Sequence, residues 1–503
     1  MRATMLSRYA LLLLAFLLVF SSFALSACAD ETDLPDDEPA TETPETPDTE
    51  EPEEEIEPEV LPDVPEDGDY AFDLNVMHWT VIGLENVWTI WEEICPDEEI
   101  TSLTGDLITD DIYNRTEWIR ENYGINVTKG LQEHNTLPQV VANMISSGSD
   151  EYQMLVEFGF DAQRVFGKNY FLDLASLDYI DFEKPWWVDS AISELSLGDY
   201  VEFGVSDMLL LDKASTTMTF YNVQMATDLG ISGLYEDVEN NKWTIETMAE
   251  YAEMALTDDG DGEWTDMDTY GIISGDDPTH NFYIGAGLHF LAKDQNGDYY
   301  YQYGSDENTI DVMITILDEI LYQDFYWNTW QNQNNPNISF KDGSALFSVE
   351  TARSCNSLRH MDDAYGILPN PLYDEYQEQY YSQVSNYGDS MFAVFNTAGD
   401  PSKVAAAIEL LSYYSYYNVY PDFYDVVIQG RGTRDAESKE MLEIIFNSRT
   451  YDLGLLYDPN SVSDAILRYP INNDTNIASF LASWEDRLDS AIDNLHDLRD
   501  AYN

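Results

Sequence analysis

Carboxylates dominate the side chains of this 503-residue chain that could do chemistry, with 96 Asp and Glu against 22 Lys and Arg. Paired carboxylates can act as acid and base, but at this density pairs arise by chance and do not argue for a glycosidase. The chain has no GxxxxGK[ST], GxGxxG, GxSxG, HExxH or CxxC motif, and its six His do not cluster. The sequence therefore predicts no enzyme and no required cofactor.

One acidic segment, residues 257–268, has the spacing of a cation site. Its sequence TDDGDGEWTDMD resembles an EF-hand-like calcium loop, although Thr257 stands where the first ligand is usually Asp. The carboxylates at loop positions 3, 5, 7 and 12 are Asp259, Asp261, Glu263 and Asp268. Because position 12 is Asp where Glu would bind bidentately, two interpretations stand: a structural calcium site, or an acidic turn between a helix and a strand.

Strand-like apolar runs alternate with amphipathic helical segments over most of the chain. Residues 72–79 predict a strand, residues 110–123 a helix that ends before Gly124, and residues 244–256 a helix capped by Thr244. Residues 294–298 predict a hairpin turn. This alternation favours an α/β fold with largely parallel sheets.

The first residues have the pattern of a secretory signal. Two arginines precede an apolar run at residues 10–20, which at about 1.5 Å per residue is too short to span a bilayer. The following Leu25-Ser26-Ala27-Cys28 resembles the lipobox of bacterial lipoproteins, whose cysteine receives lipid. Residues 1–27 are therefore predicted to be a signal peptide and Cys28 the lipidated residue; a plain signal peptide with an incidental cysteine is the alternative.

An acidic linker is predicted from residue 28 to residue 69. From Asp30 to Asp69 the chain has 20 Asp or Glu, no Lys or Arg and repeated Pro, which is typical of an extended, disordered tether. The remaining chain has 76 acids against 20 bases, a formal charge of −56, and is long enough for two or three domains. Such a surface repels nucleic acid, so no nucleic-acid partner is expected.

Cysteine is sparse in the rest of the chain. Apart from Cys28 only Cys95 and Cys355 are present. Their spacing does not imply a disulfide, so two unpaired core thiols are expected, with a single disulfide as the alternative.

Several short motifs occur in a fixed order between residues 70 and 460. They are FYN at 220–222, DLGI at 228–231, KWTIE at 242–246, DTYGI at 268–272, FKDGSALF at 340–347 and YGILPNP at 365–371. Their order and spacing resemble the signature of family 1 extracellular solute-binding proteins of ABC importers, with WT where that family has TW. Residues 424–452 are similar to a branch of this family that is common among lipoproteins.

The resemblance implies a two-lobed α/β fold, like that of periplasmic binding proteins, with a hinge and an interlobe cleft. We expect lobe 1 to comprise residues 70–215 and 345–390, and lobe 2 residues 216–344 and 391–503. Hinge closure can bury a small solute on both sides. The implied function is capture of a solute without chemistry and its delivery to ABC permease subunits, by a monomer anchored through lipid to the outer face of the cell membrane.

The expected ligand is a mono- or oligosaccharide, since most characterised members of the family bind sugars and aromatic rings suit sugar C–H faces. A non-sugar solute is the alternative. Loops that follow strand ends favour Trp79, Glu157, Phe158 and Asp207 as ligand contacts. Alignment with the family adds His280, Asn281, Tyr283, Glu350, Arg353 and Arg431. Second-rank candidates, expected in the core or at the hinge, are Trp186, Trp187, Trp327 and Trp330.

Each candidate also has a structural interpretation as a packed ring, a helix cap or a salt-bridge partner. Two other classes of protein fit the same sequence. An extracellular carbohydrate-active enzyme would need carboxylates that face each other across the cleft. A signalling or adhesion lipoprotein of the same fold would have no permease partner.

Overall fold

The computed structural model describes residues 60–502, apart from 67, 82–91, 263, 266, 276–277, 330–338, 429–435, 458–460 and 470–475. The described residues belong to one compact unit, Glu59–Asn503. The predicted signal peptide, Cys28 and most of the predicted linker lie outside the described residues, as do Glu263, Trp330 and Arg431. No helix within the described ranges combines the length and the apolar character needed to cross a membrane.

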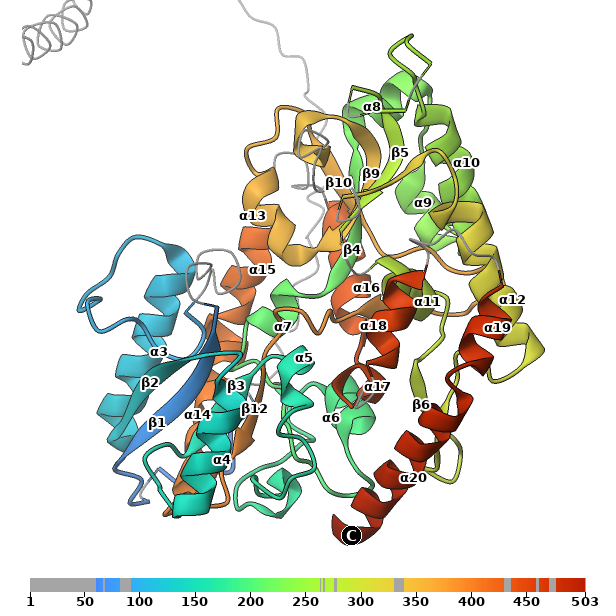
Figure 1. Cartoon of the computed structure of the whole chain (residues 1–503). Helices are drawn as coiled ribbons and strands as arrows, with labels where there is room; N and C mark the ends of the chain where they lie inside the picture. Colours follow the sequence, from blue (N-terminus) through green and yellow to red (C-terminus); the bar gives the residue numbers. More distant parts are fainter. Residues whose placement is uncertain are drawn as a thin grey trace, which may run out of the picture. The chain divides into compact units, whose positions relative to one another are not determined.

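The first sheet has four strands in the order β12-β3-β1-β2 (Figure 1). Its strands are β1 (Phe72–Thr80), β2 (Ile125–Glu133), β3 (Met154–Glu157) and β12 (Met391–Val394). β1 is parallel to β2 and β3, whereas β12 runs antiparallel beside β3, with Phe392 opposite Val156. The three parallel strands therefore end at one edge of the sheet, where the following loops can gather side chains.

The second sheet has five strands in the order β10-β4-β9-β5-β8. Its strands are β4 (Thr217–Asn222), β5 (Tyr270–Ser274), β8 (Tyr326–Asn328), β9 (Ala345–Thr351) and β10 (Tyr365–Leu368). β5 is parallel to β8 and β9, but β4 is antiparallel to β9 and β10. The expectation of largely parallel sheets thus fits the first sheet better than the second.

The two sheets correct the expected lobe boundaries. β9 and β10 lie within residues 345–390, which were assigned to lobe 1, yet they pair with β4 and β5 of the second sheet. β12 lies in the segment assigned to lobe 2, yet it pairs with β3 of the first sheet. The placement of these strands is therefore wrong, because short strands that are buried over most of their length have no pattern that identifies their sheet.

The helices follow local signals that the sequence shows. Asp106 caps α3 by accepting a hydrogen bond from the backbone of Thr109, Thr244 caps α10 in the same way, and Gly124 ends α3 with φ 70°. The helices are α3 (Leu107–Tyr123), α4 (Leu137–Ser147), α5 (Gly159–Ala162), α6 (Asp189–Leu195), α7 (Leu211–Ala214), α8 (Val223–Leu229), α9 (Leu234–Glu239), α10 (Ile245–Ala255), α11 (Pro278–Gly285), α12 (Glu307–Ile316), α13 (Cys355–Leu358), α14 (Pro401–Asn418), α15 (Tyr420–Ile428), α16 (Ala436–Asn447), α17 (Leu453–Leu456), α18 (Val462–Leu467), α19 (Ile477–Ala482) and α20 (Glu485–Tyr502).

Short elements complete the fold. The strands β6 (Leu291–Lys293) and β7 (Tyr299–Tyr301) form the predicted hairpin, in whose turn the side chain of Asp294 accepts hydrogen bonds from the backbone of Asn296 and Asp298. Single turns of 3-10 or π helix are η2 (Leu174–Ser176), η3 (Leu317–Leu321), η4 (Phe340–Asp342) and η5 (Ala352–Ser354).

Up to the end of α16, the described chain passes between the two sheets at three places. The first crossing, residues 206–216, contains α7 and enters β4; the second, residues 369–390, leads from β10 to β12 and contains β11 (Ser382–Gln383). The third crossing leads from α14 through α15 to α16, which packs on β10. β11 pairs with β13 (Arg449–Thr450), and Val384 bridges Thr216. Segments distant in sequence therefore lie side by side at the hinge.

Apolar cores support both sheets. One buried cluster includes Leu74 and Val156 of the first sheet, and another joins Phe220 of β4 to Leu442 of α16. Cys95 and Cys355 are buried free thiols, which confirms the expectation of two unpaired cysteines. Burial raises the pKa of each thiol to about 12. Both therefore stay protonated and unreactive near neutral pH.

Candidate functional site

A row of aromatic rings lies at the carboxyl ends of β1 and β3. It consists of Trp79 in β1, Phe158 just after β3, Phe160 in α5 and Tyr387 in the second crossing. Successive ring centroids are 4.7, 6.3 and 4.8 Å apart, and the last pair is stacked. Trp79 and Phe158 are buried, whereas Phe160 and Tyr387 are partly exposed. The row therefore leads from the core of the first lobe to a stacked aromatic pair that solvent can reach.

Two buried carboxyl groups flank this row. Glu157, the last residue of β3, accepts a hydrogen bond from the backbone of Phe158 at 3.1 Å, but its Oε2 has no hydrogen-bond partner among the described residues. Burial, reinforced by the nearby Asp161, raises the pKa of Glu157 well above its usual value. Asp389 accepts a hydrogen bond from the backbone of Gly159 at 2.7 Å, and burial raises its pKa to about 7. These carboxyls can therefore be protonated near neutral pH and donate hydrogen bonds.

A third buried acid at this edge contacts two basic side chains. Asp161 of α5 lies 2.6 Å from Nδ1 of His134, which follows β2, and 3.2 Å from Nε of Arg164. The imidazole of His134 also contacts Phe158, with ring centroids 5.6 Å apart. Asp161 thus holds the loop after β2 against the loop after β3, which fixes the position of the aromatic row.

The strand ends of the second sheet carry a different set of groups. The hydroxyl groups of Ser274 in β5 and Tyr326 in β8 are hydrogen-bonded to each other, and burial raises the pKa of Tyr326 to about 12. Asn328 ends β8, and half-buried Glu350 lies next to the end of β9. This edge therefore offers hydroxyl, amide and carboxylate groups close to solvent.

Arg353 follows β9 and contacts the crossings. Its guanidinium donates hydrogen bonds to the hydroxyl of Ser215 at 3.2 Å and to the carbonyl of Gly388 at 2.6 Å. Burial lowers the pKa of Arg353 to about 10, which still leaves the group charged at neutral pH. Arg353, a predicted ligand contact, thus also links β9 of the second sheet to the first and second crossings.

The structure gives other predicted ligand contacts partners inside the protein. Asp207 forms an ion pair of 2.9 Å with buried Lys213. Asn281 accepts a hydrogen bond from Thr217 at 2.6 Å. His280 is buried in α11, and burial lowers its pKa to about 4, so it is a neutral core histidine at physiological pH.

Further candidates are also packed. Tyr283 is fully buried, and its hydroxyl has no hydrogen-bond partner among the described residues. The indole groups of Trp186 and Trp187 both donate hydrogen bonds to buried Glu409, at 2.7 and 2.9 Å. Trp327 lies in β8 beside Tyr270. Trp186 and Trp187 are thus buried packing residues, whereas Trp327 is only partly buried.

Sequence reasoning selected only part of this site. It included Trp79, Glu157 and Phe158 but missed Phe160, Tyr387 and Asp389. The motif E-F-G-F-D at residues 157–161, with a second aromatic residue two positions after Phe158, is a signal that could have identified Phe160. Asp389 and Tyr387 give no comparable signal, because only the pairing of β12 with β3 brings the second crossing to this edge.

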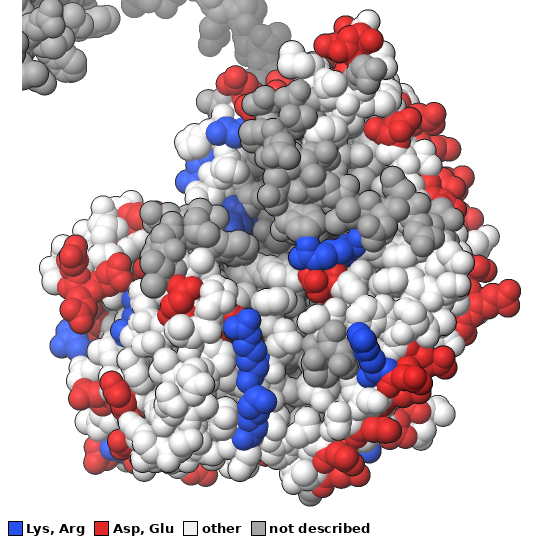
Figure 2. All heavy atoms as spheres, viewed as in Figure 1, with Lys and Arg blue, Asp and Glu red and all other residues white. Residues whose placement is uncertain are grey.

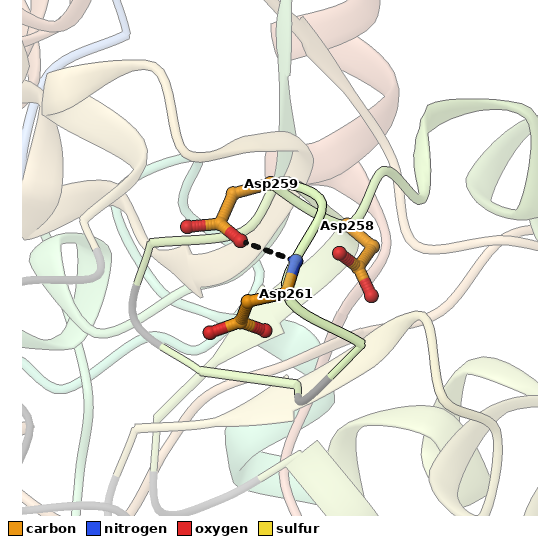
Figure 3. Close-up of side chains that lie close together, drawn as sticks. All are labelled: Asp258, Asp259 and Asp261. Atoms are coloured by element: carbon orange, nitrogen blue, oxygen red, sulfur yellow. Dashed lines mark hydrogen bonds between the residues drawn. The ribbon is translucent and has the colours of Figure 1, made fainter.

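Three acidic side chains of the predicted calcium segment lie close together (Figure 3). Carboxylate oxygens of Asp258, Asp259 and Asp261 lie within 4.8 Å of one another. Asp268 is buried, and its two oxygens accept hydrogen bonds from the backbone of Asp259 and Thr265, at 2.7 and 2.6 Å. The described residues therefore bring Asp259 and Asp261 together, and Asp268 stabilises the loop. Calcium binding stays a prediction.

Acidic side chains are prominent on the face of the molecule seen in Figure 2, where they lie mostly toward its periphery and basic side chains are few. This distribution agrees with the formal charge of −74 for the whole chain. Long-range repulsion of anionic macromolecules follows from such a surface.

Two α/β lobes joined by three crossings, with side chains gathered at strand ends, define the class of two-lobed binding proteins. The family of bacterial extracellular solute-binding proteins matches residues 120–424, more than half of the chain. The chain belongs to this family. No curated protein matches it in sequence.

Solved structures with the same fold are distant in sequence. A sugar transporter from Rhizobium etli in an open conformation has a TM-score of 0.51 and 12% identity, covering 86% of this chain and 100% of its own. The galacto-N-biose-/lacto-N-biose I-binding protein of an ABC transporter from Bifidobacterium longum, in complex with lacto-N-biose, has a TM-score of 0.50 and 14% identity, with coverages of 85% and 98%. A cyclo/maltodextrin-binding protein complexed with maltotetraose has a TM-score of 0.51 and 11% identity, with coverages of 85% and 97%. These similarities establish the fold.

Proposed function

We propose that this protein captures an extracellular mono- or oligosaccharide between its lobes and delivers it to the permease subunits of an ABC importer. The observation that carries the proposal is the aromatic row, which ends in the partly exposed stacked pair Phe160 and Tyr387 beside buried carboxyl groups. Sugar C–H faces stack on aromatic rings, while carboxyl groups bind hydroxyl groups. Family membership and the sugar ligands of the structural neighbours support the same substrate class.

The carboxyl groups of the site add a chemical preference. A buried, protonated Glu157 or Asp389 presents both a donor and an acceptor, as a sugar hydroxyl does, so the two can exchange hydrogen bonds without burying a net charge. The half-buried Glu350 on the second sheet can accept further hydroxyl hydrogens when the lobes close. A neutral, polyhydroxylated solute suits this combination better than an anionic one.

A melting screen against mono- and oligosaccharides tests the ligand class. A sugar present at about 100 times its Kd should stabilise the folded protein by about 2.7 kcal/mol, seen as a rise in Tm. The double variant Phe160→Ala/Tyr387→Ala should lose this rise, whereas Tyr376→Ala, which removes a highly exposed ring outside the row, should keep it. Flat curves with every sugar, together with a shift for peptides or polyamines, would replace the proposed substrate class with a non-sugar solute.

The lipid anchor at Cys28 is the second part of the proposal. The acidic tether would keep the binding unit close to the permease, which raises the effective concentration of captured solute there. Cys28→Ser should release the protein into the medium and impair solute uptake, while the purified variant keeps its affinity for the ligand. Retention of the variant at the membrane, or a loss of affinity, would contradict this role of Cys28.

A further inference from the structure

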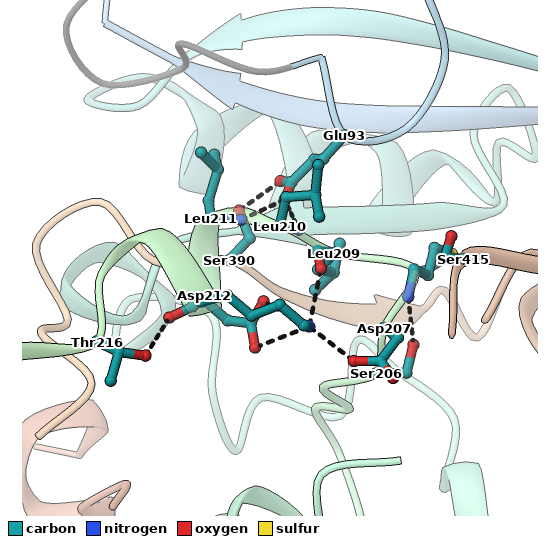
Figure 4. A network of polar contacts seen from close by, with 12 residues as sticks. Glu93, Ser206, Asp207, Leu209, Leu210, Leu211, Asp212, Thr216, Ser390 and Ser415 are labelled. Carbon is teal, nitrogen blue, oxygen red and sulfur yellow. Dashed lines mark hydrogen bonds and ion pairs between the residues drawn. The ribbon is translucent and has the colours of Figure 1, made fainter. Parts of the chain in front are cut away.

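A buried network of four charged side chains lies at the crossings. Nζ of Lys213 is 2.9 Å from Asp207 and 3.3 Å from Asp212, two acids that are labelled in Figure 4. The guanidinium of Arg449 is 2.7 Å from the other oxygen of Asp212. Lys213 and Asp212 are fully buried. The two acids and two bases balance in formal charge, so each charge in the interior has a compensating partner.

This network contacts each of the three crossings up to the end of α16. Lys213, Asp212 and Asp207 belong to the first crossing. Arg449 lies in β13, directly opposite Ser382 of the second crossing. The ring of Tyr420, at the start of α15 in the third crossing, lies 5.4 Å from Nζ of Lys213, within the range of a cation–π contact.

The first crossing is also fixed at its other side. The carboxylate of Glu93 accepts hydrogen bonds from the backbone of Leu210 and Leu211, at 2.9 and 3.0 Å, and from the hydroxyl of Ser390 at 2.5 Å (Figure 4). It also lies 2.9 Å from His78 in β1. Glu93 therefore attaches the first crossing to the first sheet and to the end of the second crossing.

Apolar side chains could fill the same space, and they often stabilise a fold as well as a buried ion network does. Charged groups add directionality, because an ion pair with short hydrogen bonds tolerates little sliding between the segments that it joins. In a two-lobed protein the crossings are the segments that must bend while remaining in contact. A network that holds all of them together therefore determines where bending can occur.

We propose that Asp212, Lys213 and Arg449 are positioning residues that hold the three crossings together as one pivot during opening and closing of the lobes. The bending is then confined to the backbone on either side of this pivot. The inference rests on the proposed capture of a solute by lobe closure. Its test needs no ligand, so it can fail independently of the proposed function.

Distances between spin labels on the two lobes of the full-length protein provide the test. In a Cys28→Ser background, Ser146→Cys in α4 and Glu253→Cys in α10 place exposed labels on the first and second lobes, while Cys95 and Cys355 are buried. Pulsed electron–electron double resonance should show a narrow distance distribution for this doubly labelled parent protein. Arg449→Met should broaden the distribution by at least half its width, because the second crossing is no longer attached to Asp212. Asp212→Asn, which keeps the volume of the side chain, should broaden it less.

The matched control is Glu409→Gln in α14, which perturbs a buried carboxyl that is bonded to Trp186 and Trp187 and not to the charged network. It should lower the Tm without broadening the distribution. If Arg449→Met fails to fold, Asp212→Asn decides the question alone. Distributions that superimpose on that of the parent protein, with a lowered Tm as in the control, would overturn the proposal and make the network a purely structural element.

Discussion

The carboxyl ends of the strands differ between the two sheets. On the first sheet they carry buried groups: the rings of Trp79 and Phe158, and the carboxyls of Glu157 and Asp389. On the second sheet they carry Asn328 and Glu350, which are only partly buried. Buried groups are held by their neighbours before any ligand arrives, whereas partly exposed groups can adjust. Combined with the proposed function, this difference predicts that the first lobe binds the solute and that the second lobe closes over it.

The largest difference between the two lobes should be in the loss of unfolding free energy when a tryptophan is replaced. Trp79→Ala removes a fully buried indole and should lower the free energy of unfolding by about 3–5 kcal/mol. Trp327→Ala removes a partly exposed indole of the second sheet and should cost about 1–2 kcal/mol. Urea denaturation measures both. Equal losses of unfolding free energy in the two variants would contradict the tighter packing of the strand ends on the first sheet.

The pH dependence of stability should have opposite signs in the two lobes. Burial raises the pKa of Glu202, Asp389 and Glu409, all beside the first sheet, to about 7. Their contribution is complete below the unfolded pKa of about 4 and is lost as the pH rises through 7. Burial lowers the pKa of His280 in the second lobe to about 4, so its contribution is complete above about 6.5 and is lost as the pH falls toward 4.

The Tm should therefore rise as the pH falls from 8 to about 6, by an amount equivalent to about 1–3 kcal/mol, because three carboxyls outweigh one histidine. Melting curves between pH 4 and pH 8 measure the profile. Glu409→Gln should reduce the change in Tm on the alkaline side of this profile, and His280→Gln should reduce it on the acidic side. A Tm that increases steadily toward pH 8 would show that these carboxyls are ionised in the folded protein.

Ligand affinity should depend more strongly on the rings of the first lobe than on the second sheet. Phe160→Ala or Tyr387→Ala should weaken binding of the sugar found in the melting screen by about 10-fold, equivalent to about 1.4 kcal/mol. Tyr326→Phe should weaken it by only about 3-fold, because its hydroxyl is already bonded to Ser274. Isothermal titration calorimetry measures each Kd. An inverted order would assign the main binding surface to the second lobe.

The smallest effect concerns the acidic loop of the second lobe. If Asp258, Asp259 and Asp261 hold calcium, their exposure and low ligand number predict a Kd of about 0.1–1 mM. Calcium at about 10 times this Kd should then add about 1.4 kcal/mol, seen as a modest rise in Tm that the double variant Asp259→Asn/Asp261→Asn lacks. Calorimetric titration without heat, and a Tm unaffected by chelation, would leave the loop as an acidic turn.

Local features of the fold were predictable from the sequence. The first strand, the end of α3 at Gly124 and the Thr244 cap depend on residues close in the chain, and the structure confirms all three. The sheet to which β9, β10 or β12 belongs depends on pairing between segments far apart. A run of four or five buried residues does not identify the strand with which it pairs. The motifs of the family therefore predicted the two lobes but not their correct boundaries.

The site shows the same division. Positions after strand ends led to Glu157 and Phe158, because the direction of a strand can be inferred locally. The role of Asp207 could not be inferred locally. Its carboxylate is paired with Lys213 and belongs to a network that includes Arg449, more than 200 positions further along the chain. Charge alone does not distinguish a ligand contact from half of a buried ion pair.

The late position of β12 has a consequence for biosynthesis. β3 ends at Glu157, but the strand that covers its free edge begins at Met391. At synthesis rates of about 5–20 residues per second, roughly 10–50 s separate the two strands. During that interval the edge of β3 can pair with other chains. The nascent first lobe should therefore depend on chaperones, and moving residues 391–394 nearer the amino terminus by circular permutation should reduce its aggregation.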